Sequence, residues 1–292
     1  MKRGSGRLGS AVREMVRSID ANRITGLAAE LTFFAVFSLF PGLLIVAGAL
    51  GSLDSIFGTE IAIASKSGVV EFLQKILTEK AQNVTDAVRE LFETQSGGLL
   101  TLAALLALYT LSTCFATLIE ALDLIYGVQE RRSWLRIRLL ALVLAVASIV
   151  MLAMLLTVIV VGPLVGSIGH GGQLARLAGL SEFFASIWNG MRPPFAFALL
   201  VGWVTTIYHV APNRRTPWLR ELPGGALAAV LMLASSYGFR IYLEMAASAN
   251  KILGVLGGGL ILMMWLYALS LSILVGAVFN TVYWKRESGI SS

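Results

Sequence analysis

Apolar residues gather in six long stretches of the chain, each about as long as a helix that crosses a membrane. A helix needs roughly 20 apolar residues to cross a hydrocarbon core about 30 Å thick. We predict spans over residues 28–51, 99–119, 139–167, 183–210 or 194–210, 224–245 and 252–284. The fourth span has two alternative starts because Arg192, Pro193 and Pro194 interrupt its first half. The pattern predicts an all-α integral membrane protein with about six transmembrane helices.

Two segments outside these spans also repeat their apolar residues at helical spacing. Residues 11–20 place Val12 and Val16 on one helical face and Arg13 and Arg17 on another, as in a basic helix lying on a membrane surface. Residues 52–98 are polar but amphipathic, which predicts one or two helices in a first outer loop. The predicted organisation is a basic amphipathic segment (1–27), a single six-span membrane domain (28–284) and a short tail (285–292).

Composition supports a membrane protein and argues against a soluble one. Of the 292 residues, 57% are hydrophobic and 14% are charged, and the mean hydropathy is +0.78. Soluble domains have about 25% charged residues. The formal charge of +6 comes from basic residues at the ends of apolar segments, where they act as orientation signals. We therefore predict membrane lipids as partners and no nucleic acid.

The basic residues also predict the orientation of the chain. Most of the 23 lie in the N-terminal segment, after the second and fourth spans, and in the C-terminal tail. Loops that remain in the cytoplasm carry an excess of Lys and Arg. We therefore predict that both termini are cytoplasmic and, because the first apolar run lacks a cleavage site of small residues, that the first span is retained.

Four ordered motifs resemble a known family. They are LTFFAVFSLFPGLL in the first span, LIYGVQERR after the second, VAPNRRTPWLRELPGGALAA leading into the fifth, and GVLGGGLILMMWLY through GAVFN in the sixth. In this order they resemble the YihY/BrkB family of bacterial inner-membrane proteins, over residues 22–284. The resemblance implies a six-span inner-membrane protein, from a family linked to virulence or serum resistance and suspected of transport.

Some members of that family have carried a ribonuclease BN label, which the residues do not support. A metal-dependent nuclease needs several His, Asp or Glu ligands close together. The two histidines, His170 and His209, are predicted on opposite sides of the membrane, and Cys114 is the single cysteine. We predict no catalytic residues, no metal, no cofactor and no enzymatic activity.

Ionisable or strongly polar residues within spans are the candidates for a substrate pathway, because each charge in lipid costs at least about 2.5 kcal/mol. Glu30 is either a proton or cation site or an interfacial carboxylate. Arg240 and Glu244 lie four residues apart and form either a structural ion pair or a gate, and Arg192 could add a basic rim. Asn280 needs a hydrogen-bond partner, which a neighbouring helix can supply.

Small residues and prolines mark candidate breaks in two spans. The candidates are Pro41 and Gly42 in the first span and Gly254, Gly257 and Gly258 in the sixth. The glycines permit either close helix packing or an unwound helix start that faces a substrate, as in broken transporter helices. The spacing of Gly254 and Gly258 also permits a homodimer.

Two charged segments are predicted at the cytoplasmic interface. Glu120 and Asp123 follow the second span and face Arg131 and Arg132 across a short loop, which predicts mutual charge compensation. The segment APNRRTPW is expected to set topology and to place Trp218 at headgroup level.

Two hypotheses of function follow. The first is a transporter or flippase-like protein for a small or amphiphilic solute, including an anionic one, with a cavity among spans one, four, five and six. The second is a non-transporting scaffold or envelope assembly factor that recruits a partner through the outer loop 52–98.

Overall fold

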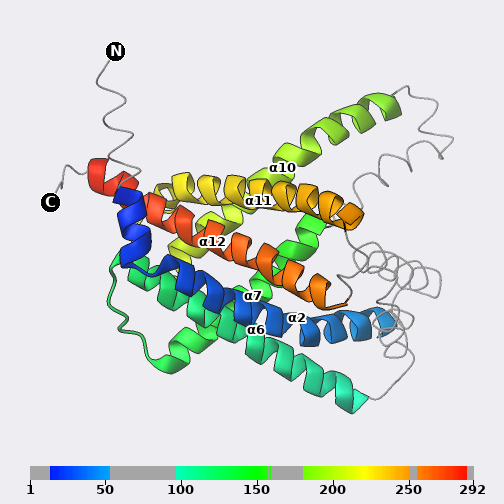
Figure 1. Ribbon diagram of the computed structural model, residues 1–292, viewed down its shortest axis with the longest axis horizontal. Coiled ribbons are helices and arrows are strands. Elements are labelled where there is room, and N and C mark those ends of the chain that lie inside the picture. The colour runs from blue at the N-terminus through cyan, green and yellow to red at the C-terminus, as the bar shows by residue number, and fades with distance from the viewer. Residues whose placement is uncertain (1–13, 53–96, 157, 159–179, 250–254, 288–292) are drawn as a thin grey trace. The chain divides into compact units, whose positions relative to one another are not determined.

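The computed structural model describes residues 14–52, 97–156, 158, 180–249 and 255–287 (Figure 1). Side chains are described over a smaller part of these ranges. Most of the predicted outer loop, the surroundings of His170, Gly254 and the end of the predicted tail lie outside the described residues.

Helices account for the regular structure of the described residues, which contain no strand. The six long helices are α2 (Ile24–Ser52), α6 (Gly97–Tyr126), α7 (Trp134–Leu156), α10 (Leu180–Val210), α11 (Leu222–Ala249) and α12 (Val255–Glu287), and η3 (Trp218–Glu221) is a short 3-10 helix (Figure 1). Five described stretches, in α6, α7, α10, η3–α11 and α12, are long and apolar enough to cross a membrane. The described apolar part of α2 is Ile24–Ser38. The predicted all-α membrane fold is confirmed, whereas the span number and the orientation stay predictions.

Helix α6 continues seven residues beyond its predicted end at residue 119. It stops where Gly127 adopts a left-handed conformation, with φ of 64°. The N–H of Gly127 donates to the carbonyl of Leu124, and the N–H of Val128 donates to that of Asp123. This paired arrangement is the Schellman motif, which satisfies the last carbonyls of a helix and favours glycine. The charged residues that suggested an earlier end instead form the last helical turns.

Helix α10 starts at Leu180 and continues through Pro193 and Pro194. Prolines remove backbone donors, but membrane helices tolerate them where neighbouring groups satisfy the freed carbonyls. Pro41 and Gly42 likewise lie within α2, and Gly257 and Gly258 within α12. The structure does not describe the side chains around these four residues, so the proposed helix breaks stay predictions.

Contacts divide the chain into two compact units. The first unit contains the described residues within Met1–Thr25, Leu118–Leu233 and Leu271–Ser292, and the second contains those within Gly26–Thr117 and Ala234–Ser270.

The second unit is held by small polar contacts between helices. The Thr32 hydroxyl lies 3.5 Å from that of Ser270. The Trp265 indole N–H donates to the Ser236 hydroxyl at 3.1 Å, and the Trp265 ring stacks on Phe239. Such contacts between helices replace the hydrophobic effect, which does not drive association in lipid.

In the first unit, glycines allow α10, α11 and α12 to pack closely. A Cβ atom added at Gly225 would overlap the Thr205 side chain of α10. One added at Gly276 would overlap the Gly224 carbonyl oxygen and the Tyr208 hydroxyl. Small residues at these positions let the backbones approach, as is usual between membrane helices.

Candidate functional site

A buried carboxylate, Glu221, accepts hydrogen bonds from several elements of the first unit. It ends η3, and its residue is 1% exposed. One carboxylate oxygen accepts hydrogen bonds from Arg214 Nη2 at 2.6 Å and Thr216 Oγ1 at 2.9 Å. The other accepts from the Tyr126 hydroxyl at 3.1 Å and Asn280 Nδ2 at 3.0 Å. Four donors, one of them a guanidinium, stabilise a charge that burial would otherwise penalise. We call these five residues the Glu221 cluster.

Asn280 joins α12 to the start of α11. Its amide nitrogen also donates to the Glu221 carbonyl at 3.2 Å, and its amide oxygen accepts from the Gly224 N–H at 2.7 Å. The first N–H groups of a helix have no partner within that helix, so a side-chain acceptor stabilises the helix start. The structure therefore shows the interhelical hydrogen bonds that the sequence predicted for Asn280.

Arg214 occupies a restricted position between Glu221 and an aromatic ring. Its guanidinium carbon lies 3.4 Å from the centroid of the Tyr126 ring, which is a cation–π contact. Its Nε atom is buried and has no hydrogen-bond partner among the described residues. The guanidinium is therefore held on one side by Glu221 and Tyr126 and keeps a donor that is unused.

A cavity of about 430 Å³ adjoins the Glu221 cluster. The end of α6, the loop after α10, η3 and the last turns of α12 contribute its lining residues, which are Tyr126, Arg214, Thr216, Arg220, Glu221, Asn280, Thr281, Trp284 and Lys285. Arg220 and Lys285 are exposed and form part of its rim. The lining combines three basic residues with one carboxylate and two aromatic rings, so it suits a ligand that is polar and acidic.

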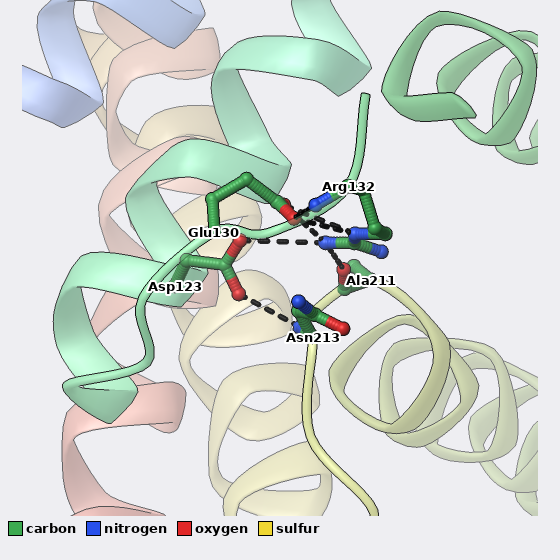
Figure 2. A network of polar contacts seen from close by, with 5 residues as sticks. All are labelled: Asp123, Glu130, Arg132, Ala211 and Asn213. Atoms are coloured by element: carbon green, nitrogen blue, oxygen red, sulfur yellow. Dashed lines mark hydrogen bonds and ion pairs between the residues drawn. The ribbon is translucent and has the colours of Figure 1, made fainter. Parts of the chain in front are cut away.

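Figure 2 shows a second polar network, which contains Asn213, the residue before Arg214 in the chain. Arg132 Nη2 contacts the carboxylates of Asp123 at 3.3 Å and Glu130 at 2.6 Å, and it donates to the Ala211 carbonyl at 2.9 Å. The other oxygen of Asp123 accepts from the Asn213 N–H at 2.8 Å. We call these five residues the Arg132 clamp. It joins the loop between α6 and α7 to the loop after α10.

The clamp confirms the charge compensation predicted between Asp123 and Arg132. The other two residues of that prediction, Glu120 and Arg131, are exposed. The bonds that Arg132 donates lower the pKa of the Glu130 carboxyl to about 2, and the contact with Glu130 raises the pKa of Arg132. Both groups therefore stay charged at neutral pH. Because solvent screens the Arg132–Glu130 pair, this pair contributes little to stability.

The clamp and the cluster are linked through the chain. Asp123 holds the backbone N–H of Asn213, and the next residue, Arg214, reaches Glu221. Fixing the backbone of Asn213 limits where the Arg214 guanidinium can lie. The clamp therefore positions a residue that lines the cavity.

Of the candidates taken from the sequence, Asn280 lines the cavity. Glu30 and Arg240 are exposed in the second unit, and Arg192 is half-buried on α10. Glu244 lies in α11, but its side chain is outside the described residues. None of these four residues is among the described lining of the cavity, and their roles stay predictions.

Sequence reasoning missed three charged residues of the loop after α10 and of η3. Arg214 lies in APNRRTPW, the segment interpreted as a topology signal and an anchor for Trp218, and Arg220 and Glu221 follow that segment. The one available sign was Glu221, an isolated carboxylate among basic residues directly before a span. Trp218 is partly exposed, and its indole N–H donates to Thr206 at 3.2 Å; its predicted place at headgroup level stays a prediction.

The part of the chain that the structure describes contains no group of three or more His, Cys, Asp or Glu side chains that could hold a metal ion. The prediction that the chain has no metal site stays a prediction.

Comparison with known proteins gives a family match and several relatives. The family model described as virulence factor BrkB matches residues 15–291. The putative ribonuclease-like protein YfkH of Bacillus subtilis is 26% identical over 267 residues, which cover 89% of this chain and 90% of that protein. A UPF0761 membrane protein of Tolumonas auensis is 28% identical, over 90% of this chain and 82% of that protein.

Some relatives are longer than this chain. A UPF0761 membrane protein of Chromobacterium violaceum is 25% identical over 94% of this chain but only 63% of its own length. No solved structure matches the chain.

Proposed function

The chain belongs to the virulence factor BrkB family, and we propose that it is a transporter or flippase-like protein that moves an anionic amphiphile across the bacterial inner membrane. Its apolar helices and its relatives make it a multi-pass membrane protein. The activity, the inner membrane as its location and the cytoplasmic termini are parts of the proposal.

The observation that carries this proposal is a charged cavity at the ends of apolar helices. A concave site with a few convergent polar groups is the usual place for a small ligand to bind. The cavity contains a buried carboxylate, three basic side chains and a volume within the range of small-molecule sites, about 300–1,000 Å³.

The basic loops suggest which side of the membrane the cavity faces. The Arg132 clamp and the Glu221 cluster lie in the segments that the positive-inside rule assigns to the cytoplasm. We therefore propose a cytoplasmic opening, through which a headgroup enters while its acyl chains remain in the bilayer.

A nuclease activity is not part of the proposal. The ribonuclease-like name belongs to the Bacillus subtilis relative, and hydrolysis would require catalytic groups at the cavity. One carboxylate with four hydrogen-bond donors is engaged in structure and is poorly placed as a general base.

Reconstitution tests the transport activity directly. The full chain is placed in liposomes that contain a fluorescent phosphatidic acid, and the fraction of label that an external quencher reaches is followed over time. We expect faster exchange than in empty vesicles and slower exchange for Arg214→Gln, with Arg215→Gln as a control because Arg215 is exposed and does not line the cavity. Exchange no faster than in empty vesicles for every anionic lipid tested would reject the proposal.

A further inference from the structure

The cavity has an excess of positive charge. Arg214, Arg220 and Lys285 contribute three positive charges and Glu221 one negative charge, so the lining has a net charge of +2. The Glu221 carboxylate already accepts four hydrogen bonds and has no capacity left for a cationic ligand. An acidic ligand would therefore meet more positive than negative charge in the lining.

Both guanidinium groups of the cavity are held by aromatic rings. Arg214 lies over Tyr126, and the Arg220 guanidinium carbon is 4.9 Å from the centroid of the Trp284 ring. The Trp284 indole N–H also donates to the Arg220 carbonyl at 2.7 Å, which fixes that ring against η3. A guanidinium placed in advance loses less entropy when it binds an anion.

These groups suit a phosphate better than other acidic groups. Arginine donates parallel N–H bonds that match the oxygens of phosphate, and both Arg214 and Arg220 line the cavity. A phosphate monoester carries about −1.5 to −2 charges at pH 7. A phosphodiester carries one charge, and a choline headgroup adds a cation that the basic lining would repel.

We propose that this cavity binds a phosphate monoester, of the kind carried by an anionic lipid headgroup such as that of phosphatidic acid. The inference rests on the proposed function, since it names the class of headgroup that would be moved. Soluble phosphate monoesters present the same chemistry, so the experiment must separate the two sources.

Binding to the purified full chain in detergent tests the inference. The ligands are dihexanoyl phosphatidic acid, dihexanoyl phosphatidylcholine and glycerol 3-phosphate, each titrated by calorimetry. We expect phosphatidic acid to bind and phosphatidylcholine not to bind. Equal affinity for glycerol 3-phosphate would assign the site to soluble phosphate esters, and much weaker affinity would assign it to a lipid; both results support a phosphate monoester site.

Four variants identify the groups responsible. Arg220→Gln and Lys285→Gln should each weaken binding about tenfold, the loss expected for one charge-assisted hydrogen bond. Arg220→Lys keeps the charge but loses the planar guanidinium, so we expect a smaller loss. Arg215→Gln removes the same charge from an exposed neighbour outside the cavity and should leave affinity unchanged. Melting temperatures show whether each variant is folded.

Three results would overturn the inference: equal binding of phosphatidic acid and phosphatidylcholine, no binding of any phosphate monoester, or the same loss for Arg215→Gln as for Arg220→Gln. Failure of the transport activity is a separate result. If the protein binds phosphatidic acid but does not exchange lipid, transport alone is rejected. If it exchanges lipid but binds no phosphate monoester, and Arg220→Gln leaves the exchange unchanged, the phosphate site alone is rejected.

Discussion

Replacing Glu221 with glutamine tests whether the Glu221 cluster stabilises the first unit. The change keeps the size of the side chain but removes its charge and one acceptor. In either amide orientation, the new NH₂ group faces donors, either those of Arg214 and Thr216 or those of Tyr126 and Asn280. At least one hydrogen bond is lost, and Arg214 keeps its charge without a partner carboxylate.

The expected cost follows from the burial of the two partners. A hydrogen bond to a charged group contributes about 1.5–3 kcal/mol. Removing one partner of a fully buried ion pair costs about 3–5 kcal/mol. The Glu221 side chain is 1% exposed, but that of Arg214 is 23% exposed, so water partly solvates the charge that remains. We therefore expect Glu221→Gln to lower the free energy of unfolding by about 2–4 kcal/mol.

Unfolding in mixed detergent and denaturant micelles, followed by tryptophan fluorescence, measures this loss. Glu120→Gln makes the same substitution at an exposed carboxylate of α6 and should change stability by less than about 0.5 kcal/mol. Adding Arg214→Gln to Glu221→Gln should cost less than the sum of the two single changes, because the orphaned charge is removed. A loss below about 0.5 kcal/mol for Glu221→Gln, or full additivity, would refute the reasoning.

Three further predictions concern the clamp and the glycine contacts. Arg132→Gln leaves the buried carboxylate of Asp123 without its ion-pair partner and should lower the free energy of unfolding by about 1–3 kcal/mol, measured as above; an unchanged value would contradict the clamp. The folded pKa of Glu130, about 2, lies below its ordinary value of 4.5, so its contribution is present above pH 4.5 and is lost as the pH falls through 2. The difference in melting temperature between the wild type and Glu130→Gln should thus shrink as the pH falls below 4.5; a constant difference from pH 4.5 to 2.5 would disprove it. Gly276→Ala should destabilise the protein by about 1–3 kcal/mol because the added Cβ overlaps neighbouring atoms. Gly202→Ala adds a Cβ in open space within a helix and should stabilise the protein by about 0.5–1 kcal/mol. Thermal melts that reverse this order would contradict the packing.

The helices were predictable because the apolar residues of each helix match a membrane environment without reference to the rest of the chain. A span must be apolar over about 20 positions whatever surrounds it. The pattern therefore placed all six long helices, and the errors concern their ends. Helix α6 continues to Tyr126 because its charged last turns find partners in loops, and hydropathy does not contain that information.

The candidate site was predictable only in part. Asn280 was identified because a polar amide in an apolar helix needs a partner, and the Asp123–Arg132 pair because the two residues are nine positions apart. The partners of Glu221 come from Tyr126 of α6, the loop residues Arg214 and Thr216, and Asn280 of α12. The largest separation is 95 residues, so no local spacing could reveal the cluster.

The sequence by itself determined that this protein consists of apolar helices in a membrane. An apolar segment of this length crosses lipid as a helix because a helix makes its backbone hydrogen bonds within itself. It also determined which segments are basic. Only the tertiary structure decided that a carboxylate before α11 is buried, that a guanidinium stacked on Tyr126 pairs with it, and that the remaining basic groups surround a cavity. The physical reason is that hydropathy acts on each segment separately, whereas the cost of burying a charge depends on donors that arrive from distant parts of the chain.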